Sequence, residues 1–153
     1  MKKILITLLL FVGSLAAMQA QEIKWMSLDE ALKAQKKVAK PIFMDVYTDW
    51  CGPCKMLDKN TFQAPDVAAY VNANYYAVKF NAEGNSEVNY KGQKFTNPNH
   101  DPGRAGRNSV HEFTMLLKVQ GYPSMFIIDS KGELKAPIVG YRTPEQLLPL
   151  IKV

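Results

Sequence analysis

The arrangement of apolar and polar positions predicts alternating helices and strands in the first half of the chain. Ser27 and Glu30 form a capping box, in which the serine oxygen accepts from a free backbone N–H and the glutamate reaches back to the serine backbone. Apolar residues recur at helical spacing behind it, which predicts a first helix over residues 28–37. The apolar, β-inclined residues 42–47 predict a central strand, and residues 75–80 predict a second buried strand.

Two further helices are predicted between and beside these strands. One begins at the pair of cysteines that follows the central strand. The sequence Ala64-Pro65-Asp66 marks the start of another, because proline is tolerated in a first helical turn, where its missing N–H would have no partner.

The middle of the chain loses its periodicity. Residues 84–108 are rich in Gly, Asn and Pro. A long irregular segment is uncommon inside a compact domain and is either functional or mobile. A second capping box at residues 109–112 predicts a helix that follows, with Val110, Phe113 and Leu117 on one face.

The last third of the chain predicts a hairpin and a final helix. Apolar residues 124–129, a turn at residues 130–133 and a returning strand at residues 134–139 give the hairpin signal. A third capping box at residues 143–146 opens the helix, and Pro149 is expected to shorten or bend it. The order β-α-β-α-β-β-α after one leading helix predicts an α/β fold, with a mixed central sheet and helices on both faces.

The start of the chain is set apart by its composition. A short basic start at Lys2 and Lys3, an apolar run over residues 4–17 and small or polar residues up to Ala20 are typical of a secretory signal peptide. We therefore expect residues 1–20 to be removed and the mature chain to be periplasmic or secreted. A retained membrane anchor is the alternative.

The remaining length and charge indicate one soluble domain. The full chain has 153 residues, of which 47% are hydrophobic and 22% charged, so a packed core is expected. Removing Lys2 and Lys3 lowers the formal net charge from +5 to +3. This mild charge, without an arginine-rich run, does not predict binding to nucleic acid.

The only two cysteines, Cys51 and Cys54, allow three interpretations. A structural disulfide would close a very short loop and gain little chain entropy, and small exported domains that depend on disulfides usually carry several. A zinc site would need His100 and His111, which have ten residues between them instead of the usual three to five. With one CxxC motif and no histidine directly after it, the sequence predicts neither haem attachment nor any other cofactor.

The third interpretation is a redox-active pair. A cysteine at a helix N-terminus faces unpaired backbone N–H groups and the positive end of the helix dipole, which favour the nucleophilic thiolate. Cys51 would be the exposed attacking residue, and Cys54, one turn later, would resolve the mixed disulfide. Gly52 lets the backbone approach the sulfur, and Pro53 is tolerated in the first turn.

The sequence Trp50-Cys51-Gly52-Pro53-Cys54-Lys55 resembles the active-site motif of the thioredoxin family. The resemblance covers roughly residues 38–83 and 117–152, and it implies a thioredoxin fold. Separated features in the family order agree with it: a strand acid at Asp45, a lysine at Lys79, a cis-proline at Tyr122-Pro123 and a glycine after the last strand at Gly140.

The resemblance implies a role for each of these residues. Asp45 would be the base that removes the proton of Cys54, with its pKa raised by burial, and Lys79 would tune this acid. The alternatives are a strand acid that is merely hydrogen-bonded in the core and a solvated lysine at the strand edge.

The implied client-binding residues are Trp50, Gly52, Pro53, Tyr122 and Pro123. Trp50 would shield Cys51 and offer apolar contact, or simply pack. The backbone beside a cis Pro123 would pair with an extended client segment, whereas a trans proline would only begin an edge strand.

Two local sequences are similar to one branch of the family, the C-terminal periplasmic domain of the membrane-embedded disulfide reductase. They are residues 40–51 and 61–67, and Tyr47 stands where thioredoxin itself has a tryptophan. The segment 84–116 is a long insertion before the cis-proline strand that neither relative needs. It either selects clients or is a tolerated surface insertion.

We therefore expect an exported thiol–disulfide oxidoreductase that reduces disulfides in client proteins and needs no metal. The Gly-Pro dipeptide is that of thioredoxin, with a potential near −270 mV, against about −120 mV for the strong periplasmic oxidant. An exported reductant also implies a membrane electron-donor protein as partner. The alternatives are a disulfide oxidase or isomerase, and a binding or chaperone-like module with little turnover.

Overall fold

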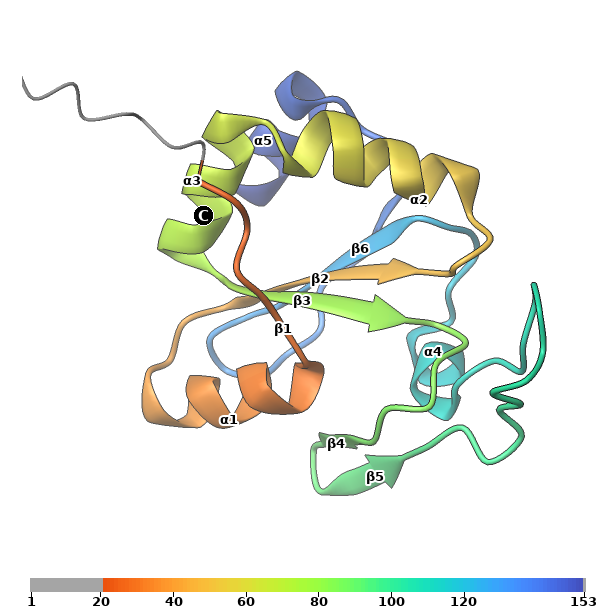
Figure 1. Ribbon diagram of the computed structural model, residues 1–153. Coiled ribbons are helices and arrows are strands. Elements are labelled where there is room, and N and C mark those ends of the chain that lie inside the picture. Colours follow the sequence, from red (N-terminus) through yellow and green to blue (C-terminus); the bar gives the residue numbers. More distant parts are fainter. Residues whose placement is uncertain (1–20, 153) are drawn as a thin grey trace, which may run out of the picture.

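The computed structural model describes residues 21–152, so the predicted signal peptide lies outside the described residues. Its centre is a five-stranded sheet in the order β1-β3-β2-β6-β7 (Figure 1). The first three of these strands are parallel to one another, β6 is antiparallel to β2, and β7 is antiparallel to β6, which confirms the predicted mixed sheet. The strands are β1 (Trp25–Met26), β2 (Ile42–Tyr47), β3 (Tyr76–Asn81), β6 (Ser124–Ile128) and β7 (Ile138–Val139).

Helices cover both faces of this sheet (Figure 1). On one face lie α1 (Leu28–Lys37) and α4 (Glu112–Leu117). The other face carries α2 (Gly52–Leu57), a turn of π-helix (Asp58–Phe62) that directly continues α2, α3 (Pro65–Asn74) and α5 (Pro144–Ile151). Each layer has its own buried cluster, and together these clusters form the core.

Successive side chains of β2 point to opposite faces of the sheet, which decides which of them reach the layer beneath α2, α3 and α5. Ile42, Met44 and Val46 belong to the cluster beneath α1 and α4, whereas Phe43 belongs to the cluster beneath α2, α3 and α5. Because successive strand residues point to opposite faces, Asp45 lies on the same face as Phe43. Its carboxylate is therefore directed into the layer that carries the cysteines.

The segment expected to be irregular contains a short hairpin that belongs to the core. Its strands are β4 (Val88–Tyr90) and β5 (Gln93–Phe95), joined at Lys91 and Gly92 with φ values of 50° and 77°. Two successive positive φ angles make the tight turn whose twist suits a two-residue hairpin. The side chains of Val88, Tyr90 and Phe95 are buried with Phe113 and Leu117 of α4. This part of the segment is therefore not a surface insertion.

The start of α4 differs from the prediction. The N-cap is His111, whose ring accepts a hydrogen bond from the backbone of Phe113. Ser109 does not cap the helix, because its hydroxyl donates to Asn97 instead, and Glu112 accepts from the backbone of Thr96. As a result the helix begins later, and the prediction that Val110 shares a helix face with Phe113 and Leu117 is wrong: Val110 precedes the helix and is 43% exposed.

The other predicted boundaries are close to those observed. The capping boxes at Ser27 and Thr143 are both present. Helix α5 continues through Pro149 and ends at Ile151. The returning strand predicted over residues 134–139 is shorter than expected, with a single bridge at Leu134 before β7. The two-residue strand β1 was not predicted.

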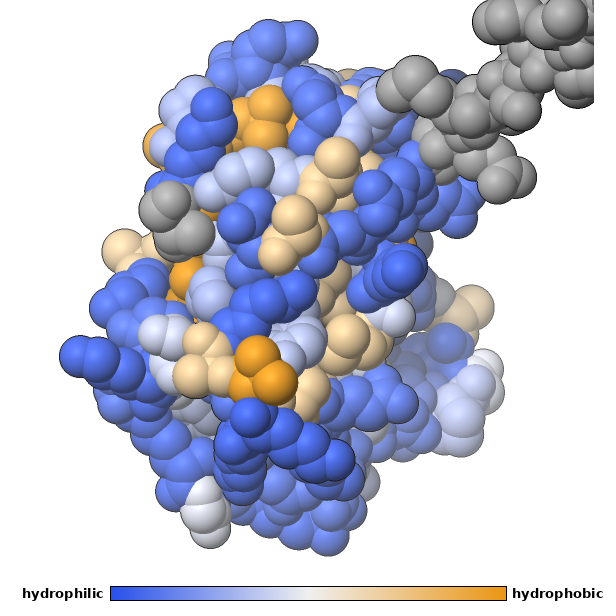
Figure 2. All heavy atoms as spheres, turned by 90° about the vertical axis from the view of Figure 1, so that its left-hand side faces the viewer, coloured by the Kyte–Doolittle hydropathy of each residue, from blue (hydrophilic) through white to orange (hydrophobic). Residues whose placement is uncertain are grey.

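The surface at the α3 end of the molecule is polar. Figure 2 views the left-hand side of Figure 1, and hydrophilic residues cover most of it, with hydrophobic ones scattered among them. Helix α2 begins at the opposite end, where β2 and β3 terminate (Figure 1). Between residues 21 and 152, no helix is long and apolar enough to cross a membrane.

Candidate functional site

The cysteine pair lies at the first turn of α2, immediately after β2. Cys51 is the N-cap of the helix, and it forms a disulfide with Cys54 across a Cα–Cα distance of 5.3 Å. The backbone N–H of Cys54 also donates to the Cys51 sulfur at 3.1 Å. This donor faces the sulfur without any rearrangement, so it would favour a Cys51 thiolate once the disulfide is reduced.

Both cysteines are buried in this disulfide form. Their exposed fractions are 3% for Cys51 and 2% for Cys54, so the expectation that Cys51 is the exposed member of the pair is wrong. The reason is that the N-cap position turns the Cys51 sulfur inward toward the helix, where it bonds to Cys54. Gly52 and Pro53 between them are exposed and form the accessible rim.

Asp45 is a fully buried carboxylate beneath this helix layer. Burial raises its pKa from 3.8 to about 6, although the ammonium group of Lys79, 2.9 Å away, acts in the opposite direction. Its second oxygen, Oδ1, has no hydrogen-bond partner among the described residues. Such a carboxylate can take up or release a proton near neutral pH.

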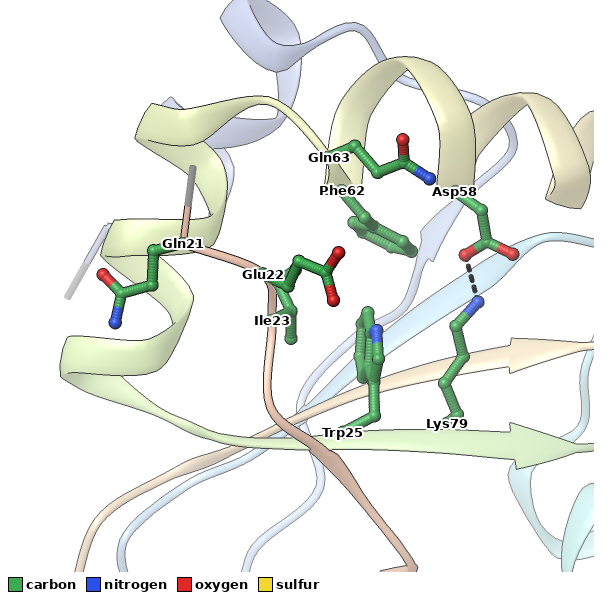
Figure 3. Close-up of a pocket in the computed structure, with 8 residues that line it drawn as sticks. All are labelled: Gln21, Glu22, Ile23, Trp25, Asp58, Phe62, Gln63 and Lys79. Atoms are coloured by element: carbon green, nitrogen blue, oxygen red, sulfur yellow. Dashed lines mark hydrogen bonds and ion pairs between the residues drawn. The ribbon is translucent and has the colours of Figure 1, made fainter. Parts of the chain in front are cut away.

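Lys79 connects two carboxylates rather than one. Besides Asp45 it contacts Asp58, on the turn of π-helix after α2 (Figure 3). Burial alone would lower the pKa of Lys79, but the two acids outweigh it and the pKa is raised. Asp58 was not predicted as a site residue, although its position four residues after Cys54 places both on one helix face.

The same ammonium group borders a pocket of about 430 Å³ (Figure 3). Aromatic rings surround it, with centroids 5.0 to 5.4 Å from the nitrogen, in Tyr47, Trp25 and Phe62. Lys79 is therefore held by charge and by aromatic faces, and it is not the freely solvated lysine of the alternative interpretation.

The peptide bond between Tyr122 and Pro123 is cis, as the resemblance implies. The carbonyl oxygen of Pro123 accepts from the backbone N–H of Gly140 at 2.8 Å, which ties this bond to the end of β7. Gly140 has a φ of +86°, a conformation that favours glycine. The Tyr122 ring meets the Trp50 ring edge to face, with centroids 5.9 Å apart. The cis-proline segment and the cysteine motif thus adjoin each other.

Two further residues contact Trp50 and were not predicted. The indole N–H donates to the carboxylate of Glu83 at 3.0 Å, and the guanidinium of Arg107 lies 4.2 Å from the ring centroid. Glu83 follows β3 by two residues, so its proximity to the site could have been inferred from the parallel pairing of β2 and β3. No sequence pattern indicates that Arg107, in the irregular segment, returns to Trp50.

Both histidines make structural hydrogen bonds. The ring of His100 contacts the carbonyl of Glu83 at 2.8 Å, and the ring of His111 contacts the carbonyl of Ser86 at 2.6 Å. Within residues 21–152, no group of three or more His, Cys, Asp or Glu side chains is placed to hold a metal ion.

Comparisons with known proteins agree on a family. A model of the thioredoxin-like domain matches residues 28–153. The thiol:disulfide interchange protein DsbD of Cronobacter sakazakii is 55% identical over 40 residues, which are 26% of this chain and 7% of the relative. DsbD of Vibrio vulnificus is 45% identical over 42 residues, which are 28% of this chain and 7% of the relative. The matches therefore span less than a tenth of these relatives.

Solved structures resemble the chain over most of its length. The solution structure of a candidate disulphide-isomerase from Bacteroides thetaiotaomicron is 30% identical, with a TM-score of 0.58, covering 86% of this chain and 93% of that one. The oxidised C-terminal domain of DsbD from Neisseria meningitidis is 23% identical, with a TM-score of 0.52, covering 82% and 95%, and shows the same fold. The family match, the fold and the Cys51–Cys54 pair show that the chain belongs to the thioredoxin-like family of thiol–disulfide oxidoreductases.

Proposed function

We propose that this protein is an exported oxidoreductase that reduces disulfides in client proteins with the Cys51–Cys54 pair. The observation that carries the proposal is the disulfide at the start of α2, with the Cys54 N–H already directed at the Cys51 sulfur. A buried acid and a cis-proline segment accompany this pair. A disulfide that served only as a structural link would need neither.

The reaction transfers two electrons to the client. The Cys51 thiolate attacks one sulfur of the client disulfide, a mixed disulfide forms and the first client thiolate leaves. The Cys54 thiolate then attacks the Cys51 sulfur, the second client thiolate leaves, and the Cys51–Cys54 disulfide remains. The client cysteines end as a protonated dithiol, and the protein is the oxidised product described here.

Asp45 is the proposed proton acceptor for the second step. The Cys54 thiol must lose its proton before it can attack, and a carboxylate with a pKa of about 6 is largely ionised at neutral pH. The oxygen without a partner leaves Asp45 able to receive that proton directly or through one water molecule. Lys79 would hold the carboxylate in place and limit the rise of its pKa.

The proposed client-binding surface is the exposed rim around the pair. Gly52 and Pro53 are exposed beside the sulfurs, and the rings of Trp50 and Tyr122 meet at the cis-proline. An extended client segment would pair with the backbone next to Pro123 by strand addition, which would bring its disulfide to Cys51.

Export and the reducing direction belong to the proposal and rest on the leader sequence and the Gly-Pro dipeptide. The short matches to thiol:disulfide interchange proteins support an interchange role. The proposed electron donor that reduces the pair again is a membrane protein, because an exported reductant needs an electron source. The similarity to a candidate disulphide-isomerase favours isomerisation as the second candidate function, with the same two cysteines.

A trapping experiment tests the proposal. Replacing Cys54 by serine removes the resolving thiol, so clients should remain attached to Cys51 as mixed disulfides in the exported compartment. These adducts would be separated under non-reducing conditions and identified by mass spectrometry. The Cys51→Ser variant is the matched control and should capture no clients, because it keeps Cys54 but lacks the attacking sulfur.

The outcome distinguishes the candidates. The oxidoreductase is supported if only the Cys54→Ser variant forms adducts and brief treatment with dithiothreitol removes them. If neither variant forms adducts, even after the cells are challenged with a reductant or an oxidant, the protein is a binding module and the proposal is wrong. Adducts that form only with clients carrying non-native disulfides would favour the isomerase.

A further inference from the structure

The loop between β5 and α4 contacts the residue that precedes Cys51. Its residue Arg107 places a guanidinium over one face of the Trp50 ring, 4.2 Å from the centroid. The same indole is held at its N–H by Glu83 and meets the ring of Tyr122 edge to face. Trp50 is therefore fixed in position, and Arg107 forms the outer side of this arrangement.

The loop is anchored on both sides of Arg107. The backbone N–H of Asn108 donates to Glu83 at 2.8 Å, on the oxygen that also receives the indole N–H. The side chain of Asn97 is buried and donates to the carbonyls of Gly84 and Ser109. These bonds connect the ends of the loop to the chain that follows β3, so Arg107 is held close to the cysteine motif.

The charge of Arg107 remains available to a ligand. The side chain is exposed, and none of its N–H groups donates to another of the described residues. A guanidinium held over an aromatic face still has N–H donors at its edge, and these can bind a carboxylate at two points. Contact with the ring also restricts the conformations of the Arg107 side chain, so less conformational entropy would be lost when a carboxylate binds.

Two acidic residues that adjoin Trp50, Glu83 and Asp49, form hydrogen bonds elsewhere. The carboxylate of Glu83 is 9% exposed and accepts from Trp50 and Asn108. Asp49, which precedes Trp50, accepts from the side chain of Asn81 at 3.0 Å. Neither forms an ion pair with Arg107, so neither carboxylate occupies the guanidinium over the Trp50 ring.

We infer that Arg107 is a specificity-determining residue, which favours client disulfides that have a carboxylate close to one cysteine. The inference rests on the proposed function and adds the substrate class. The electron transfer is unchanged: the client still receives two electrons, and Cys51 and Cys54 still form the disulfide. Arg107 acts before that step, because it attracts and orients the client segment over Trp50.

Two synthetic peptides test the inference. Each contains one internal disulfide, and they differ only at the residues next to the cysteines, which are Asp and Glu in one and Asn and Gln in the other. The second-order rate constant for reduction by the dithiol form of the protein is measured for both. One exposed ion pair predicts that the acidic peptide reacts about fivefold faster, and that the ratio falls toward one in high salt.

The variants separate charge from packing. Arg107→Gln should lower the acidic-to-neutral ratio from about fivefold to near one, and Arg107→Lys should keep an intermediate ratio. Arg104→Gln is the matched control: it removes an exposed charge from the same loop that does not contact Trp50, and it should preserve the ratio. Circular dichroism and the melting temperature verify that the variants are folded.

The inference and the proposed function fail in different ways. If the protein reduces both peptides at equal rates, or if Arg107→Gln slows both by the same factor and preserves the ratio, Arg107 does not select acidic clients. If the dithiol form reduces neither peptide nor a small aromatic disulfide, the oxidoreductase proposal itself is wrong.

Discussion

At the scale of single residues, Asp45 places a charge where solvent cannot reach it. Its side chain is fully buried, and the stabilising contact with Lys79 offsets only part of the desolvation, because the pKa is still raised to about 6. The folded state therefore binds a proton more tightly than the unfolded chain does. A buried acid maintained in this way is typical of a site that transfers protons.

This shift predicts how stability depends on pH. Between pH 3.8, the ordinary value, and about 6, the folded state holds more protons, so stability falls as the pH rises through this range. The full loss, on the order of 3 kcal/mol, is present above about pH 7. Asp45→Asn should therefore be more stable than the parent at pH 7.5 and differ little at pH 4.

Urea unfolding of the oxidised protein at the two pH values measures this difference. The control is Asp49→Asn, which removes an exposed carboxylate near the same helix and should give no comparable gain at pH 7.5. A gain for Asp45→Asn of equal size at pH 4 and pH 7.5 would contradict the interpretation of a buried, titrating acid.

The redox pair was predicted from its own spacing and context, whereas Asp45, Lys79 and the cis-proline were implied by the resemblance to the thioredoxin family. Both kinds of prediction missed contacts that depend on tertiary structure. Arg107 reaches Trp50 only because the intervening loop folds back, and no local pattern encodes that path. The inward direction of the Cys51 sulfur likewise depends on its N-cap hydrogen bond and on the disulfide with Cys54.

At the scale of secondary-structure elements, the hairpin β4–β5 shows how local preferences can be overlooked. Val88 and Tyr90 alternate with a polar residue, and Lys91-Gly92 supplies the turn. The strands are only three residues each, too short to stand out from a segment rich in Gly, Asn and Pro. The helices with capping boxes at Ser27 and Thr143 were predicted well, because their signals are local and strong.

The burial of this hairpin predicts a large effect of mutation. Phe95 is 6% exposed, and its ring lies 5.5 Å from that of Phe113. Phe95→Ala should lower the free energy of unfolding by about 3–5 kcal/mol, since it leaves a cavity in the layer beneath α4. Gln93→Ala, on the exposed part of the same strand, should change it by less than about 0.5 kcal/mol. Similar small values for both variants in urea unfolding would show that the hairpin is a surface addition.

At the scale of the whole molecule, the sheet joins two separate layers with different functions. The layer beneath α1, α4 and the hairpin is packed mainly by apolar side chains, with His111 and Thr114 buried beside them. The layer beneath α2, α3 and α5 contains the buried acid and the cysteine pair. Strand β2 contributes to both layers, because its side chains alternate between the two faces of the sheet. The packing of Met44 and Val46 in one layer therefore fixes the position of Asp45 in the other.

The direction of electron transfer is a property of this whole arrangement. If the protein is a reductant, its reduction potential should lie nearer to about −270 mV than to about −120 mV. Equilibration with glutathione buffers, followed by alkylation of free thiols and mass spectrometry, measures the fraction of the Cys51–Cys54 disulfide. A reduction potential of about −120 mV would indicate an oxidase, and one of about −180 mV would indicate an isomerase.

The layer beneath α2, α3 and α5 joins residues from both ends of the described chain. Its cluster joins Ile23 from the start of the described chain with Leu147 and Ile151 from the end, and the Tyr75 hydroxyl donates to the carbonyl of Ile151. Contacts between such distant residues form slowly, because a long loop must close before they stabilise the fold. The cluster cannot be completed until α5 has been synthesised. The packing of this layer therefore requires α5, although the strands beneath it precede α5 in the sequence.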